Sequence, residues 1–290
     1  MGLCDDVRES CARIAAGARF VRIDLDALDD VRPAPPPELD PVRHYLEGPE
    51  RDVATYMLTL DALNFGSGWF PTLRKRPGCS GYFTVAWSLA DRFRAHGPWS
   101  NAELRAMRAD EMAVTLGQPR DHELVALFAQ ALRSLGSWLG DRDAVAVVGE
   151  ARGSAERLAT MLAAGMALFD DRGFYKRAQI AASDLALAGV ARFYDLDRLT
   201  IFADNLVPHV LRCDGVLRYD ASLAARIDSG ELLRLGAEER EIRACAVHAC
   251  ELVAERAHVA PYELDNWLWS RGQASAYKAR PRHRCRTVYY

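Results

Sequence analysis

Apolar side chains recur every three or four residues along most of the chain, a pattern typical of helices that bury one face. Three stretches show it most clearly: Leu124, Leu127, Phe128, Ala131, Leu132 and Leu135; Leu158, Met161, Leu162, Met166 and Phe169; and Ile242, Cys245, Ala249 and Val253. A shorter apolar run at residues 144–148 is either a strand or a buried turn of helix, because periodicity does not separate the two. The pattern predicts an all-α, mainly helical fold.

Polar residues mark where several of these helices begin. Ser100 and Glu103 have the spacing of a capping box, in which each side chain bonds the backbone of the other residue. Asp40 followed by Pro41 predicts another helix start, with Asp as the N-cap and Pro in the first turn. Asp121 is predicted to cap a third helix.

The proline-rich residues 33–37 form the clearest break in the chain, and a polyproline-like connector is expected there. After this connector no further linker is evident. We therefore predict that residues 1–37 are an N-terminal extension with a proline-rich connector, packed on one compact domain of residues 38–290.

Composition narrows the class of protein. Half of the residues are hydrophobic and the net charge is −3, so a large core is expected and a broad basic surface for coating nucleic acid is not. No run of about 18 apolar residues is present, which predicts no membrane span. The acidic start, with Asp5, Asp6 and Glu9, is unlike a signal peptide, so a cytoplasmic location is expected.

The cysteine and histidine patterns do not indicate a metal or disulfide framework. The seven cysteines are an odd number and include no CxxC pair, which favours reduced thiols. The seven histidines form neither HxxxH nor HExxH. No metal and no other cofactor are predicted.

Three stretches depart from the amphipathic pattern, at residues 63–71, 174–184 and 199–208. The first mixes glycines with large aromatics and Asn64, which is typical of either a binding loop or an ordinary loop packed on the core. In the second, Lys176, Gln179 and Ser183 share one helical face, which is either functional or simply solvated. In the third, Asp204 stands between two apolar runs. It is a helix N-cap, a reactive carboxylate in a pocket, or both.

With the C-terminal tail, these stretches resemble the queuosine-salvage family. The matching segments are NFGSGWFP (64–71), SGYFTVAWSLADRF (80–93), GFYKRAQI with ASDLA (173–186), LTIFADNLVPHVLR (199–212), LDNWLWSRGQ (264–273) and PRHRCRTVYY (281–290). The resemblance implies hydrolysis of queuosine 5′-monophosphate to queuine and ribose 5-phosphate. It also implies a single domain similar to the helix-hairpin-helix DNA glycosylases.

The resemblance also assigns candidate site residues. Asp204 is the expected catalytic carboxylate, because breaking an N-glycosidic bond gives an oxocarbenium-like sugar that a fixed negative charge stabilises. The other predicted substrate-binding residues are of three kinds: polar groups for the base edge, aromatics that sandwich the base, and cations for the phosphate. They are, in that order, Asn64, Gln179, Asp184 and Asp265; Phe65, Tyr175 and Trp267; and Lys176, His283 and Arg286.

The last residues alternate in type. Arg282, Arg284 and Arg286 alternate with His283, Cys285 and Thr287, which suits an extended tail laid across the domain with one side buried. The alternative is a disordered chain end, which is the common case.

Rival functions differ in what they bind. A DNA glycosylase needs a basic DNA-binding face, and a tRNA-binding accessory protein needs a basic stripe, and neither fits the charge of −3. A non-catalytic queuine or nucleotide carrier would use the same pocket without hydrolysis. The expected partner is a small-molecule substrate, with no nucleic-acid duplex and no membrane, and the protein is expected to be a monomer.

Overall fold

The computed structural model describes residues 2–290 and confirms a mainly helical fold. The first half of the chain contains α1 (Leu3–Ala16), β1 (Val21–Ile23), η1 (Ala27–Asp30), α2 (Glu50–Ala62), η2 (Phe70–Thr72), α3 (Gly81–His96), α4 (Asn101–Ala106), α5 (Ala109–Leu116), α6 (Glu123–Leu139) and α7 (Ala144–Glu150). The second half contains α8 (Ala155–Gly165), η3 (Ala167–Phe169), α9 (Lys176–Leu187), η4 (Leu196–Arg198), α10 (Val207–Cys213), β2 (Leu217–Tyr219), α11 (Ala221–Asp228), β3 (Leu232–Leu233), α12 (Ala237–Ala257), α13 (Pro261–Arg271), α14 (Ser275–Lys278) and β4 (Arg284–Cys285).

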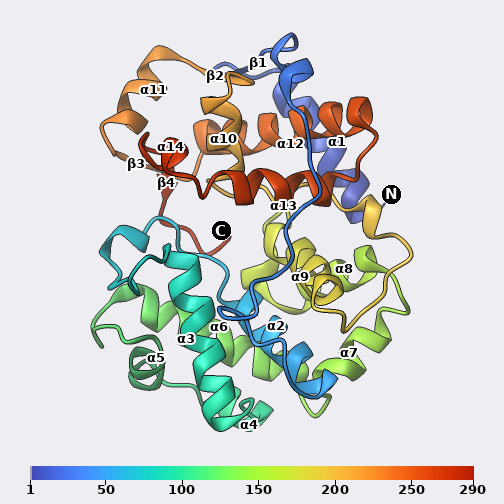
Figure 1. Ribbon diagram of the computed structural model, residues 1–290, viewed down its shortest axis with the longest axis vertical. Coiled ribbons are helices and arrows are strands. Elements are labelled where there is room, and N and C mark those ends of the chain that lie inside the picture. The colour runs from blue at the N-terminus through green and yellow to red at the C-terminus, as the bar shows by residue number, and fades with distance from the viewer. Residues whose placement is uncertain (1) are drawn as a thin grey trace.

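The helices form two layers that meet across the middle of the molecule (Figure 1). Helices α2 to α9 make one half, and α1 with α10 to α14 makes the other. The segment between η1 and α2, which holds the proline-rich residues, crosses the front of the molecule from one half to the other. Helix α1 packs along α12, and β1 pairs with β2, so the N-terminal residues contact the rest of the chain. The division at residue 37 stays a prediction.

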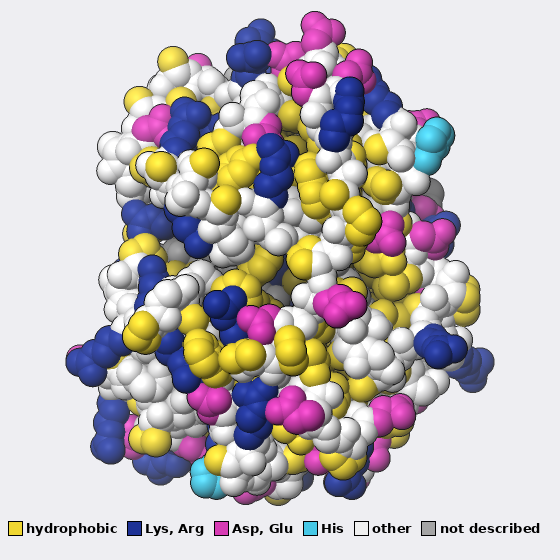
Figure 2. All heavy atoms as spheres, in the orientation of Figure 1, with side chains coloured by type: hydrophobic (Ala, Val, Ile, Leu, Met, Phe, Trp, Pro, Cys, Tyr) yellow, Lys and Arg dark blue, Asp and Glu magenta, His cyan; other side chains and the backbone are white. Residues whose placement is uncertain are grey.

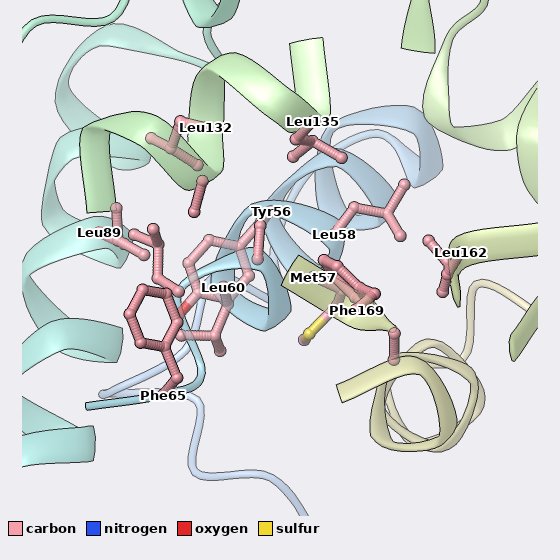
Figure 3. Close-up of a cluster of buried hydrophobic side chains, with 14 of the residues drawn as sticks. Tyr56, Met57, Leu58, Leu60, Phe65, Leu89, Leu132, Leu135, Leu162 and Phe169 are labelled. Carbon is pink, nitrogen blue, oxygen red and sulfur yellow. The ribbon is translucent and has the colours of Figure 1, made fainter. Parts of the chain in front are cut away.

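Each half buries its own set of apolar side chains. In the first, Tyr56, Met57, Leu58 and Leu60 of α2 lie among side chains of α3, α6 and α8 (Figure 3). In the second, the stripe predicted along α12 is buried, with Ile242, Cys245, Ala249 and Val253 all at most 2% exposed. Burying a large apolar side chain contributes about 1.5–3 kcal/mol, so these two clusters account for the association of the helices.

Several predicted helix starts need correction. Ser100 and Glu103 do form a capping box at α4. After Asp40, however, the chain makes a single turn, and the helix begins only at Glu50, because Pro49 disfavours helical backbone at the residue before it. His122, and not Asp121, caps α6 through its Nδ1 atom, which accepts from Leu124 N. Residues 144–148 lie in helix α7, so the strand alternative is wrong.

The C-terminal tail is built into the fold as the alternating pattern predicted. His283, Cys285 and Thr287 are at most 3% exposed, and β4 pairs in parallel with β3. The chain end is held by two backbone contacts, because Gly66 N donates to Tyr290 O at 2.9 Å and the Arg177 guanidinium donates to Val288 O at 2.9 Å.

A buried ion pair connects the two halves behind this tail. The Arg243 guanidinium of α12 pairs with Asp171, which precedes α9, and its Nε atom donates to Ala203 O at 2.8 Å. Glu239 is a second carboxylate partner, at 3.3 Å. Arg243 therefore fixes the backbone immediately before Asp204.

Replacing Asp171 with Ala is expected to lower the free energy of unfolding by about 3 kcal/mol, because it leaves a buried guanidinium without its main partner. Chemical denaturation measures the change. The matched control is Asp170→Ala, which removes only the exposed ion pair with Arg172 and is expected to have little effect. Equal stabilities for the two variants would contradict a supporting role for the Arg243 pair.

In residues 2–290 no helix combines the length and the apolar character that crossing a membrane requires.

Candidate active site

Asp204 ends a buried apolar segment at the border between the two halves. Residues 199–203 are at most 1% exposed, and Asp204 follows them and lines the cavity together with Phe202. Its Oδ1 atom accepts from the backbone amides of Leu206 at 2.7 Å and Val207 at 2.9 Å. Asp204 thus holds the turn that leads into α10, but it is not the predicted N-cap of a helix starting at Asn205, because α10 begins at Val207 and its N-cap is Leu206. Because one oxygen is held by amides, the carboxylate is fixed in place.

Lys176 is the first residue of α9 and its ammonium group is buried in the same region. Its Nζ atom donates to Asn64 O at 2.9 Å and to Asn64 Oδ1 at 2.7 Å. Burial lowers the pKa of Lys176 to about 8, and the negative charges of Asp204 and Asp61 oppose that shift. Lys176 thus provides a positive charge close to Asp204 in the interior.

A cavity of about 380 Å³ opens in front of these two residues, and both halves of the molecule line it. Figure 2 shows a hollow at the middle of this face, surrounded largely by hydrophobic side chains. The size lies within the range of small-molecule sites. The walls come from the segment after the proline-rich connector, the loop at Asn64, one face of α9, the loop at Asp204, helix α13 and the C-terminal tail.

Aromatic rings form one wall of the cavity. Tyr82 and Phe83 of α3 pack edge-on against Trp269 of α13, with ring centroids 5.3 and 5.5 Å apart. His44 supports Tyr82 through a hydrogen bond of 3.1 Å between its Nε2 atom and the tyrosine hydroxyl. This wall offers flat apolar surface to a planar ligand.

Further carboxyl groups line the floor. Burial raises the pKa of Asp265 well above its usual range, as does the negative charge of Asp204, and its Oδ1 atom accepts from Phe202 N at 2.8 Å. Burial likewise raises the pKa of Asp184, and the neighbouring Asp61 adds to the shift. Besides Lys176, three cationic side chains line the cavity: Arg282, Lys278, and Arg43, which pairs with Asp40 at 3.3 Å. Across residues 2–290 no group of three or more His, Cys, Asp or Glu side chains is arranged to hold a metal ion.

The arrangement, a fixed carboxylate beside a buried ammonium group in a cavity with an aromatic wall, suits cleavage of a glycosidic bond to a flat base. Comparison with known proteins agrees with this chemistry. Residues 44–290 match the model of the family described as "Queuosine salvage protein".

The chain belongs to the queuosine salvage protein family.

Some relatives of this family member are similar over nearly all of its length, and others over a part of it. A protein of Sphaerobacter thermophilus named "Queuosine 5'-phosphate N-glycosylase/hydrolase" is 34% identical over 312 residues, covering 96% of this chain and 95% of the relative. A protein of the same name from Schizosaccharomyces pombe is 25% identical, covering 99% and 96%. One from Dictyostelium discoideum is 38% identical over 40% of each chain. The family resemblance predicted from the motifs is confirmed, while the similarity to DNA glycosylases stays a prediction.

In this queuosine salvage protein, the cavity brings together about half of the predicted site residues. Those that line it are Asn64, Phe65, Lys176, Asp184, Asp204 and Asp265. Phe65 does so from within the core, because its ring packs against Phe128 and the Arg177 guanidinium lies 4.6 Å from its centroid. That arrangement leaves Phe65 as part of the floor and not as a free stacking face.

Three predicted residues lie away from the cavity because of helix geometry or internal hydrogen bonds. Tyr175, with left-handed backbone at φ 50°, lines a separate surface groove near Leu3. Trp267 lies two positions from Asp265 on α13, which is the opposite helical face, and Trp269 lines the cavity instead. The amide of Gln179 is used internally, because it accepts from Thr200 N at 2.9 Å and donates to Phe174 O at 2.8 Å.

The two predicted phosphate ligands of the tail are also outside the cavity. His283 is 1% exposed, and burial together with the charge of Arg243 lowers the pKa of its ring to about 3, so it is neutral. Arg286 is exposed and pairs with Glu123 at 3.1 Å. Arg282, on the same side of the extended tail as Arg286, is the tail arginine that lines the cavity.

Sequence reasoning did not single out several residues of this region as site residues. Tyr82 and Trp269 line the cavity, and Asp61 lies directly behind it. Asp61 did carry a signal, because it stands alone among apolar residues of α2 just as Asp204 does in its own segment. The pattern of residues gave no such signal for the aromatic pair Tyr82 and Trp269, because only the fold brings α3 and α13 together.

Proposed function

We propose that the protein hydrolyses the N-glycosidic bond of queuosine 5′-monophosphate, releasing queuine for tRNA modification and ribose 5-phosphate. The observation that carries the proposal is Asp204, whose carboxylate is held by two backbone amides inside the cavity. The names of the relatives supply the substrate.

The mechanism follows from where charge develops. As the bond to the base breaks, positive charge grows on C1′ and the ring oxygen of the sugar. A carboxylate already fixed next to C1′ stabilises this charge without reorganising, so it lowers the barrier more than it strengthens binding of the substrate. Asp204 also accepts the proton of the attacking water. The positive charge of Lys176 offsets the negative charge of Asp204 and so helps to keep this carboxylate ionised in the interior. Hydrolysis needs no covalent bond between the lysine nitrogen and C1′.

The rest of the cavity suits the remaining parts of the substrate. The aromatic wall of Tyr82, Phe83 and Trp269 stacks on the base, and the carboxyl groups face its polar edge. Arg282 and Lys278 are the cations available to the 5′-phosphate. In residues 2–290 all seven cysteines are free thiols, which is consistent with action in the cytoplasm. The protein acts as a monomer on a free nucleotide.

The direct test is to incubate the protein with queuosine 5′-monophosphate and to follow queuine by chromatography. Catalytic release of free base, many turnovers per protein molecule, is expected. Binding of the nucleotide without release of base would instead identify the protein as a carrier.

The monophosphate is expected to be cleaved at least about tenfold more efficiently than the nucleoside, and inorganic phosphate is expected to inhibit. Phosphate binding energy lowers the barrier at the reacting centre, so its loss reduces kcat as well as affinity. Replacing Arg282 with Ala removes a charge-assisted contact and is expected to lower kcat/KM for the monophosphate about 10- to 100-fold.

The nucleoside should be little affected by that change. The matched control is Arg284→Ala in the same tail, because Arg284 donates to Gly230 O and does not line the cavity. If Arg282→Ala slows both substrates alike, the phosphate is bound elsewhere.

A further inference from the structure

Two carboxyl groups lie side by side behind Lys176, where the end of α2 packs against α9. Asp61 is completely buried and Asp184 is 5% exposed. The Oδ1 atom of Asp61 accepts a weak hydrogen bond of 3.4 Å from Asn64 Nδ2. No amide or hydroxyl group of residues 2–290 donates to its Oδ2 atom. The remaining neighbour is the carboxyl group of Asp184, with which Asp61 shares a hydrogen bond.

A hydrogen bond between two carboxyl groups requires one of them to hold a proton, because an ionised carboxylate only accepts. The nearby cations do not neutralise the pair directly. Lys176 donates to Asn64, and the Arg177 guanidinium donates to backbone carbonyls, including that of Asp61. The titratable groups around the pair are Tyr56 of α2, Tyr82 of α3, Lys176 and Arg177 of α9, and Asp265 of α13, with Asp204 on the other side of Lys176.

Of the two carboxyl groups, only that of Asp184 faces the cavity. Lys176, Ile180, Asp184 and Leu187 all line it, so one face of α9 runs along its length. A rise of 1.5 Å per residue places Asp184 about 12 Å along the helix from Lys176. A substrate whose sugar lies at Asp204 and Lys176 can therefore extend its base along this face of α9 toward Asp184.

We propose that Asp61 and Asp184 hold one proton between them and that Asp184 delivers it to the departing base. The inference rests on the proposed function. As the bond from C1′ to the base nitrogen breaks, its electron pair passes to the base. The proton of Asp184 then moves to a heteroatom of the six-membered ring. Water adds to C1′ and gives its own proton to Asp204, and when the products leave, Asp204 releases that proton to solvent and the pair takes one from solvent.

The chemistry of the substrate explains why such an acid is useful. A 7-deazaguanine has carbon at position 7, so the ring nitrogen at which purines are commonly protonated is missing. Protonation must come from the side of the six-membered ring, which is the end of the cavity where Asp184 lies. Asp184 is the catalytic residue in this step. Asp61 is a positioning residue, because its negative charge and hydrogen bond keep the proton on Asp184.

The test separates proton donation from mere binding by changing the leaving group. Queuosine 5′-monophosphate needs an acid, whereas 4-nitrophenyl riboside 5-phosphate releases a stable nitrophenolate and does not. Asp184→Asn is expected to lower kcat on the first about 10²- to 10³-fold and on the second by no more than about threefold. Asp265→Asn is the matched control, because it alters another buried carboxyl group of the cavity and should slow both substrates alike. Equal losses for Asp184→Asn on both substrates would overturn the proposal.

A second measurement uses Asp61→Asn and the natural substrate. A general acid must be protonated, so kcat falls as the pH rises through its pKa. Removing the charge of Asp61 lowers the pKa of Asp184, and the alkaline limb of the kcat profile is expected to move to lower pH. A melting temperature near that of the native protein shows that the variant is folded.

An unshifted alkaline limb would overturn the role of Asp61. If the native protein does not cleave the nitrophenyl compound, the pH profile of Asp61→Asn alone tests the proposal that the pair supplies the proton. Failure of the native protein to release queuine at all would instead reject the proposed function. The two failures are therefore distinguishable.

Discussion

Replacing Asp204 with Asn is expected to lower kcat by about 10²- to 10³-fold while the protein stays folded. The carboxylate charge stabilises the oxocarbenium-like sugar, and removal of one such preorganised group costs about 3–4 kcal/mol in the barrier. The fold is kept because the Asn side-chain oxygen still accepts from the amides of Leu206 and Val207. Steady-state release of queuine measures the effect, with thermal melting as a check on folding.

Asp220 provides a matched control for this substitution. Like Asp204 it accepts from two backbone amides, because its Oδ1 atom accepts from Ser222 and Leu223 as the N-cap of α11, but it does not line the cavity. Asp220→Asn changes the same chemical group in the same local structure and should leave kcat unchanged. Near-native turnover by Asp204→Asn, or an equal loss in both variants, would remove Asp204 from the mechanism.

A chain that ends at Cys285 is expected to melt at a clearly lower temperature and to lose nearly all activity. The truncation removes Tyr290, which is 2% exposed and packs against Arg243 with the guanidinium 4.6 Å from its ring. It also leaves the amide of Gly66 and the guanidinium of Arg177 without their partners in the tail. Burial of one aromatic side chain contributes about 2–3 kcal/mol, and the lost hydrogen bonds add to that cost.

The activity should fall even at temperatures where the truncated protein is folded, because Tyr290 forms part of the cavity wall. Arg286→Ala is the control within the same tail, since Arg286 is exposed and makes surface contacts, an ion pair with Glu123 and a distant cation–π contact with Trp69. That variant should keep both its melting temperature and its turnover. If truncation changes neither quantity, the tail is dispensable.

The sequence was informative where the site depends on local pattern. Asp204 and Lys176 stand at positions where a charged residue interrupts an apolar or helical pattern, and both reach the cavity. The periodic stripes also predicted which faces of α6 and α12 are buried. Alternation along residues 282–287 predicted an extended tail laid across the domain, because an extended chain turns successive side chains to opposite sides, and the structure buries the side with His283, Cys285 and Thr287.

Other features depended on contacts between distant parts of the chain. Gln179 and Lys176 lie three residues apart on one helix, but Thr200 takes up the glutamine amide while the lysine reaches Asn64. His283 looks like a phosphate ligand beside two arginines, yet the parallel pairing of β4 with β3 carries it into the interior. Periodicity gives the spacing along an element and does not give the element that packs against it.

The position of Tyr290 also bears on the order in which the molecule folds. Tyr290 lines the cavity, and its carbonyl oxygen accepts a hydrogen bond from the amide of Gly66, which lies far away in the sequence. Contacts between residues so distant in the chain are costly in entropy to close, so they form late in folding. The cavity wall at Tyr290 is therefore expected to be among the last parts of the molecule to assemble.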